Sequence, residues 1–384
     1  MSSFDAVATA VQKLLMNAPA IAVAAVKDGE LVYSHAAGSI ETGVPADVEG
    51  TVFMVASISK TMNGLLCMLM KESGELDLDK DISEYTGTII RNPYFAEVPV
   101  TARHLLWHTS SLKDDESAVN SFGQWKTSDV DCTVGLEAYV LARLMDPGSA
   151  RRIWSDVRGP TNPRILDASG WYNYSNAGAT LLEWVLEKVA SVPYAQLVQT
   201  RIFDALGMAR SKYTLFEAQQ LQGASLAVPQ LVGHYGVAEV PAAGLRTTAG
   251  DLARFLAALT NPCRCPISAE SLSEMLPDDG FAGLGWWGMD FPYGESRSDE
   301  CVFAHGGLME GVRTHIYIWP KRQAGAVILT NSSCDYSLVA SALKKAVLEG
   351  TAQRQNRQNR KQKQEAHANQ ARRNGSGQDL EEVS

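Results

Sequence analysis

Cysteine is scarce in this chain, and long apolar runs are missing from it. The 384 residues include six cysteines without a Cys-x-x-Cys pair, so neither a disulfide framework nor a paired-thiol site is expected. No apolar run reaches the roughly 18 residues that span a bilayer, which predicts no membrane span. Asp5 and Lys13 interrupt the apolar positions near the N-terminus, so we expect an amphipathic helix rather than a signal peptide, and a cytoplasmic protein.

An excess of positive charge is also missing. The net charge of −9 makes nucleic acid an unlikely main partner. Residues 351–384 differ, because seven basic residues between Arg354 and Arg373 stand against the single acid Glu365. This stretch has almost no apolar side chains to bury, which predicts a disordered polar tail. Contact of its basic run with RNA or an acidic surface stays open.

Two common catalytic signatures are absent. The Gly-x-Ser-x-Gly elbow does not occur, which excludes the usual α/β-hydrolase type of serine enzyme. His104 and His108 have the spacing of two metal ligands on one helical face, but the His-Glu-x-x-His pattern is missing. The sequence therefore predicts neither a metal nor an organic cofactor.

The hydrophobic pattern predicts an α+β fold. Strand-like runs at 21–26 and 31–37 flank an Asp-Gly turn, and runs at 302–305, 314–319 and 326–330 indicate an antiparallel meander. Helical periods dominate from about 75 to 215, and the Gly- and Pro-rich stretch 146–170 predicts a long loop. We expect a discontinuous α/β sheet domain over 1–60 and 225–350, with an all-helical subdomain inserted over 61–224.

One Ser-x-x-Lys motif lies in a favourable context. Ser57-Ile58-Ser59-Lys60 opens the apolar stretch 58–73, which predicts a buried central helix that ends near Gly74. One helical turn would bring Lys60 to the Ser57 hydroxyl, and the helix N-terminus favours negative charge there. These conditions would activate a nucleophile. The motif alone is weak, because Ser-x-x-Lys recurs at 110–113 and 341–344.

Two later motifs strengthen the first. Tyr174-Ser175-Asn176 fits a Tyr-x-Asn element, and His305-Gly306-Gly307 stands on a predicted strand where Lys-Thr-Gly would be expected. In this order the motifs resemble the serine β-lactamase and penicillin-binding protein superfamily, at its class C, esterase and D-aminopeptidase end. The resemblance extends over residues 4–347. It implies a β-lactamase/transpeptidase-like fold, an antiparallel sheet flanked by helices.

The resemblance also implies roles for the catalytic residues. Ser57 would form an acyl-enzyme, with Lys60 or Tyr174 as the base. Burial favours a neutral lysine, whereas a nearby ammonium favours a phenolate, so the sequence leaves the choice open. Asn176 would orient Lys60 and the carbonyl oxygen of the substrate.

The third motif would complete the substrate site. The backbone N–H groups of Ser57 and Leu308 would hold the oxyanion, while Gly306 and Gly307 would allow close approach. A histidine, His305, replaces the usual lysine of this motif and is a weaker anchor for a substrate carboxylate. Arg246 or Arg313 could replace the missing charge, but each fits equally well as a surface residue or a structural ion-pair partner.

Together these features predict a serine hydrolase acting on a small ester or amide rather than on β-lactams. Two alternatives remain open: an acyltransferase with the same site, and a catalytically idle scaffold. The oligomeric state is not predicted.

Overall fold

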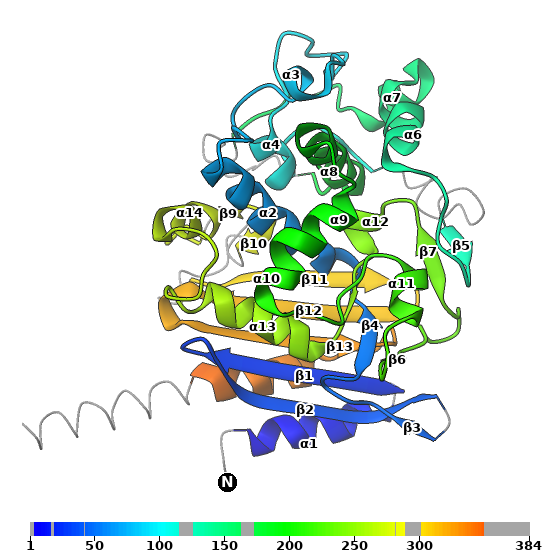
Figure 1. Cartoon of the computed structure of the whole chain (residues 1–384), viewed down its shortest axis with the longest axis vertical. Coiled ribbons are helices and arrows are strands. Elements are labelled where there is room, and N and C mark those ends of the chain that lie inside the picture. The colour runs from blue at the N-terminus through cyan, green and yellow to red at the C-terminus, as the bar shows by residue number, and fades with distance from the viewer. Residues whose placement is uncertain are drawn as a thin grey trace, which may run out of the picture.

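An eight-stranded antiparallel sheet forms the centre of the computed structural model, which describes residues 4–16, 19–41, 43–114, 126–162, 173–280, 282–288 and 301–348. The predicted polar tail, 351–384, lies outside the described residues. In spatial order the strands are β3 (Val44–Pro45), β2 (Glu30–Glu41), β1 (Ala20–Lys27), β13 (Ala324–Thr330), β12 (Val312–Trp319), β11 (Phe303–Met309), β10 (Trp286–Gly288) and β9 (Ala282–Gly283) (Figure 1).

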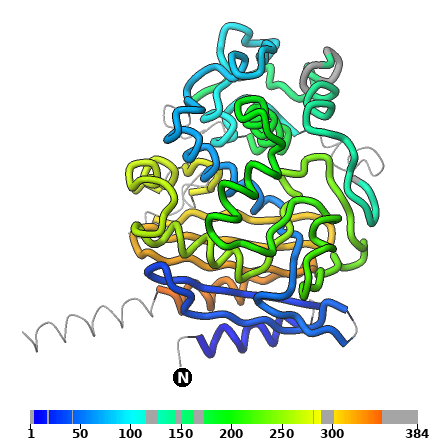
Figure 2. The backbone as a smooth tube through the Cα atoms, in the orientation of Figure 1, coloured from blue at the N-terminus to red at the C-terminus, as the bar shows by residue number. Residues whose placement is uncertain are grey.

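The two ends of the described chain meet in this sheet. Strand β1 pairs with β13 in antiparallel register, from Ile21 opposite Thr330 to Lys27 opposite Ala324. Figure 2 shows the blue N-terminal and orange C-terminal segments side by side. The predicted hairpin is confirmed, with Asp28 and Gly29 at φ 53° and 76° in its turn. The predicted meander is confirmed as β11, β12 and β13.

Both faces of the sheet are covered by helices. Alternation along β1 points Ala22 and Ala24 toward α2 (Lys60–Glu72) and α13 (Ala249–Leu259), whereas Ile21 and Val23 contact α1 (Asp5–Leu14) and a helix over 337–348. Thr248 caps α13 by accepting the amide N–H of Asp251. The result is a core on each side of the sheet.

Helix α2 is the buried central helix that the sequence predicts, but it begins two residues later than expected. A short 3₁₀ turn, η1 (Ala56–Ser59), precedes it, and the chain leaves it through Gly74 at φ 76°. A Cβ on Gly64 would lie 2.1 Å from the carbonyl oxygen of Leu284, so α2 packs directly against the turn before β10. The side chain of Ser57 therefore lies in a tight turn before the α-helix.

Helices gather above the sheet in Figure 1. Helical segments over 136–145 and 194–206 lie within the stretch where the sequence predicts helices, and each is partly wound as a π-helix. The predicted loop 146–170 is wrong in part, because 147–153 form a helix that starts at a proline, a favoured first helical residue. These helices are α3 (Ser83–Thr86), α4 (Ala102–Leu106), α6 (Leu136–Val140), α7 (Pro147–Ile153), α8 (Asn176–Ala190), α9 (Tyr194–Val198) and α10 (Asp204–Leu206).

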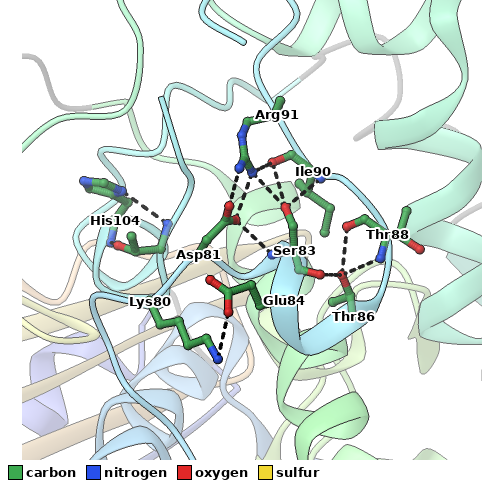
Figure 3. Close-up of polar contacts among 10 residues, drawn as sticks. Lys80, Asp81, Ser83, Glu84, Thr86, Thr88, Ile90, Arg91 and His104 are labelled. Carbon is green, nitrogen blue, oxygen red and sulfur yellow. Dashed lines mark hydrogen bonds and ion pairs between the residues drawn. The ribbon is translucent and has the colours of Figure 1, made fainter. Parts of the chain in front are cut away.

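An ion pair holds the loop around α3. Arg91 Nη1 donates to Asp81 Oδ1 at 2.8 Å and to Ser83 Oγ at 2.7 Å, as Figure 3 shows. His104 lies nearby, where its Nδ1 accepts the amide N–H of Thr101 and closes the cap of α4. That contact gives His104 a structural role at the helix start.

Short elements connect the sheet to the helices. They are β4 (Thr51–Met54), β5 (Lys126–Ser128), α11 (Leu215–Gln219), β6 (Ser225–Leu226), β7 (Tyr235–Val237), α12 (Val240–Ala243), β8 (Arg246–Thr247) and α14 (Ala269–Met275). No helix in the described part of the chain is both long and apolar enough to cross a membrane. The predicted domain boundaries at 60/61 and 224/225 stay a prediction.

Candidate active site

A strained backbone turn presents Ser57. Strand β4 ends just before Ala56, whose φ of 50° is unusual for a residue with a Cβ. The turn is held because Ser59 Oγ donates to the Ala56 carbonyl at 2.6 Å and Thr314 Oγ1 donates to the Val55 carbonyl at 2.8 Å. Ala56 and Ile58 are buried, while Ser57 keeps partial exposure. Ser57 is therefore the one residue of η1 that is not buried.

Lys60 is buried beside that hydroxyl and has three oxygen neighbours. Its Nζ lies 2.6 Å from Asn176 Oδ1, 2.8 Å from the carbonyl oxygen of Ala242 and 3.2 Å from Ser57 Oγ. The first two oxygens can only accept hydrogen bonds, whereas a hydroxyl can accept or donate. The third position on Nζ, toward Ser57, can therefore be an N–H that donates to the hydroxyl or a lone pair that accepts the hydroxyl proton.

Tyr174 lies on another side of the same ammonium. Its ring centroid is 4.9 Å from Lys60 Nζ, a distance that suits a cation–π contact. The ring also lies 4.5 Å from His108 and stacks on Trp287 at 5.7 Å with an interplanar angle of 14°. These neighbours fix the ring, and Lys60 and Tyr174 both remain candidates for the base.

Asp114 is a site residue that the sequence reasoning missed. Its Oδ2 accepts from Asn176 Nδ2 at 2.7 Å, and its Oδ1 accepts from the Ala177 amide at 3.1 Å and from Ser175 Oγ at 3.2 Å. The contact to Nδ2 turns the opposite end of the Asn176 amide, its oxygen, toward Lys60. An acid at the start of α8 is also favoured by the helix dipole. No local motif marks it, since 62 residues separate it from Asn176.

The third motif lies on β11 and packs against the segment that leads into η1. A Cβ on Gly307 would stand 2.2 Å from both the Val55 carbonyl oxygen and Thr314 Oγ1, so only glycine fits there. A Cβ on Gly306 would meet nothing closer than 3.7 Å. The close approach expected of both glycines therefore depends on Gly307 alone. Leu308 follows with its side chain 69% exposed.

His305 is buried and neutral. Burial, with a smaller contribution from the charge of Lys60, lowers the pKa of His305 to about 3. Its Nδ1 lies 2.9 Å from the Gly306 carbonyl oxygen, an acceptor, so Nδ1 carries the ring proton. This imidazole offers no positive charge to a substrate at neutral pH.

Neither arginine supplies the missing charge. Arg246 is buried and donates to the backbone carbonyls of Gly244 at 3.0 Å and Tyr235 at 2.5 Å, so its role is structural. Arg313 lies 5.4 Å from the ring of Tyr336, on the sheet face opposite to its neighbour on β12, Thr314. Of the two roles that the sequence leaves open for each arginine, these contacts favour the structural one.

A small pocket beside Tyr174 is lined by aromatic and imidazole groups. His108, Trp286, Trp287 and His305 form much of its wall. His108 Nδ1 accepts the amide N–H of Ser175 at 3.2 Å, and burial, aided by the Lys60 charge, lowers the pKa of His108 well below its usual value. Both histidines thus contribute neutral rings, and the sequence reasoning did not assign His108 to the site.

Comparison with known proteins agrees with this arrangement. The chain matches the family described as Beta-lactamase over residues 7–349, and it belongs to that family. A penicillin-binding protein of Bacillus subtilis (strain 168) is 28% identical over 191 residues, which are 50% of this chain and 37% of the relative. The chain thus spans well under half the length of that relative. Membership of this family supports a function of the serine hydrolase type.

Solved structures share the fold. The octameric penicillin-binding protein homologue from Pyrococcus abyssi superposes with a TM-score of 0.70 and 24% identity, covering 91% of this chain and 78% of that one. The D-amino acid amidase from Ochrobactrum anthropi SV3 gives a TM-score of 0.67 and 19% identity, covering 92% and 99%. The predicted β-lactamase/transpeptidase-like α+β fold is confirmed.

Proposed function

We propose that this protein is a serine hydrolase that cleaves a small ester or amide through an acyl-enzyme on Ser57. The observation that carries the proposal is the position of Lys60 Nζ, within hydrogen-bond distance of both Ser57 Oγ and Asn176 Oδ1. A serine hydroxyl is a poor nucleophile unless a base lies within reach of its proton. Lys60 meets this distance requirement, and Tyr174 lies beside it.

The proposed reaction has two steps. In the first, the proton of Ser57 passes to whichever of Lys60 and Tyr174 is unprotonated, the oxygen attacks the carbonyl, and the leaving alcohol or amine takes up that proton. Backbone N–H groups of Ser57 and Leu308 hold the oxyanion. In the second step, water loses a proton to the same base and attacks the acyl carbon, and the ester bond to Ser57 breaks as its Oγ takes back that proton and the acid leaves. Asn176, held by Asp114, orients Lys60 and the substrate carbonyl.

We infer the substrate class from the charged and neutral groups around Ser57. A ligand carboxylate needs a cation or several donors, and His305 is neutral at pH 7. Arg246 and Arg313 are engaged elsewhere. Lys60 already spans two carbonyl oxygens and Ser57. Esters and small amides without a carboxylate therefore fit this site better than penicillins do.

A fluorophosphonate probe followed by peptide mapping tests the nucleophile. We expect the label on Ser57 and its loss in Ser57→Ala. Ser110→Ala is the matched control, because Ser110 begins another Ser-x-x-Lys match but is buried and has no lysine contact among the described hydrogen bonds. A label on another residue, or none on folded protein, would refute the acyl-enzyme.

A substrate panel then tests the class. Short-chain p-nitrophenyl esters and D-amino-acid amides are expected to turn over faster than a chromogenic cephalosporin. Rapid cephalosporin turnover would contradict the argument from His305. Added alcohols or amines distinguish hydrolysis from acyl transfer by their products. Unchanged cellular function in Ser57→Ala would favour the idle scaffold.

A further inference from the structure

Helices α2 and α8 touch at a second pair of polar side chains, Asn63 and Glu183, besides the contact between Lys60 and Asn176. Lys60 and Asn63 lie one turn apart on α2, and Asn176 and Glu183 lie two turns apart on α8, so each pair shares one helical face. Lys60 meets Asn176 at 2.6 Å, and Asn63 Nδ2 donates to Glu183 Oε1 at 2.8 Å. The helices are therefore joined twice along the same contact line.

The second pair is more deeply buried than the first. Asn63 is 2% exposed and Glu183 is fully buried. Tyr194 Oη donates to Asn63 Oδ1 at 2.5 Å, which fixes the amide so that its nitrogen faces Glu183. The orientation of Asn63 is thus set from both sides, and α9 braces the contact between α2 and α8.

Glu183 is an unusual residue for such a position. Burial raises the pKa of Glu183 well above its ordinary value, although Asn63 and the charge of Lys60 oppose the shift. Its Oε2 finds no hydrogen-bond partner within the described residues. An apolar side chain of similar size would avoid the cost of burying this group. Stability alone therefore gives no reason for a carboxyl here.

We propose that Glu183 is a positioning residue for Lys60. By holding Asn63 across the helix contact, it fixes α2 against α8 and keeps Lys60 Nζ between Ser57 and Asn176. The contact with Asn63 needs only an accepting oxygen, so a charge on Glu183 is not required. This inference rests on the proposed function, because Lys60 is the side chain whose position it controls.

Replacements at Glu183 separate the hydrogen bond from the charge. Glu183→Gln keeps an oxygen for Asn63, and we expect its kcat to stay within about twofold of wild type, with the same pH profile between pH 6 and 8. Glu183→Met removes the acceptor, and we expect kcat to fall about tenfold or more with KM nearly unchanged, since small misplacements of a reacting group are costly. Equal losses in both variants, or none in Glu183→Met, would refute the proposal.

A double-mutant cycle separates positioning from stability. Asn63→Leu leaves the Glu183 oxygen buried without its donor and should lower the Tm most. Combining Asn63→Leu with Glu183→Met removes both polar groups, so much of the Tm should return. The kcat of the double variant should stay low, because the polar contact is still absent. Recovery of kcat together with Tm would show a purely structural role.

Two further readouts keep this inference distinct from the proposed function. Absence of fluorophosphonate label on wild-type Ser57 would refute the acyl-enzyme but would not by itself decide the role of Glu183. A crystal structure of Glu183→Met decides that role without activity. We expect the distance from Lys60 Nζ to Asn176 Oδ1 to lengthen beyond hydrogen-bonding range, and an unchanged 2.6 Å contact would overturn the inference.

Discussion

Replacing Glu183 by glutamine should stabilise the protein, and the gain should grow with pH. The unfolded chain releases this proton near the ordinary carboxyl pKa of 4.5, whereas burial raises the pKa of the folded group well above that value. Between these two pKa values the folded state binds more protons than the unfolded state, so the contribution of Glu183 to stability falls as pH rises. Glutamine does not titrate and escapes this loss.

The size of this gain in stability is set by the single proton by which the folded and unfolded states differ. Each pH unit above the unfolded pKa changes the difference in unfolding free energy between variant and wild type by about 1.4 kcal/mol, until the folded pKa is reached. For a chain of 384 residues this corresponds to about 2 °C in Tm per pH unit. Fully buried carboxyls with large shifts produce such trends over several pH units.

Thermal and urea unfolding at pH 5, 6, 7 and 8 measure this trend. The control is Glu137→Gln, because the Glu137 side chain is 57% exposed and its ion pair with Lys188 lies at the surface. The control difference should stay nearly constant over the same range. A difference for Glu183→Gln that does not change with pH would show that burial does not raise the pKa of Glu183 in the folded protein.

Three other predictions concern the site itself. Gly307→Ala should lower kcat/KM about a hundredfold, because the added Cβ would collide with the Val55 carbonyl and shift an oxyanion donor. The control Gly306→Ala should keep a kcat/KM near that of wild type, and equal losses in the two variants would contradict this packing. Asp114→Ala should lower kcat about tenfold or more in ester hydrolysis, since the amide that contacts Lys60 loses its orientation; an unchanged kcat would remove Asp114 from the site. For His305→Asn, the pH profile of kcat/KM between pH 5 and 8 should keep its shape, because the pKa of His305 is about 3; loss of an ionisation in that range would show otherwise.

Local patterns explain the parts of the fold that could be predicted. Strand-like runs on either side of the Asp28-Gly29 turn predicted the β1–β2 hairpin, and Gly-separated runs predicted the C-terminal meander. The turn at η1 could not be predicted in the same way. It depends on Thr314 and other groups distant in sequence, which hold Ala56 in a left-handed conformation.

The candidate site likewise has a part that could be predicted from the sequence and a part that could not. Motif order suggested that Ser57, Lys60 and Asn176 converge, and in the structure the three lie beside one another at the starts of η1, α2 and α8. Asp114 and the Asn63–Glu183 contact have no local signature. Asp114 lies 62 positions from Asn176 in the sequence, and Asn63 lies 120 positions from Glu183. Only the packing of α8 brings these partners together.

The pairing of β1 with β13 has a consequence for synthesis of the protein. The ribosome makes β1 well before β13, the strand that completes its hydrogen bonds and begins at Ala324. At about 5–20 residues per second, roughly 300 residues take about 15–60 s to follow. During that interval the β1–β2 hairpin presents an apolar, unpaired edge, which is the kind of surface that recruits other chains. Nascent chains stalled before β13 should therefore depend on chaperones, whereas completed chains close the edge themselves.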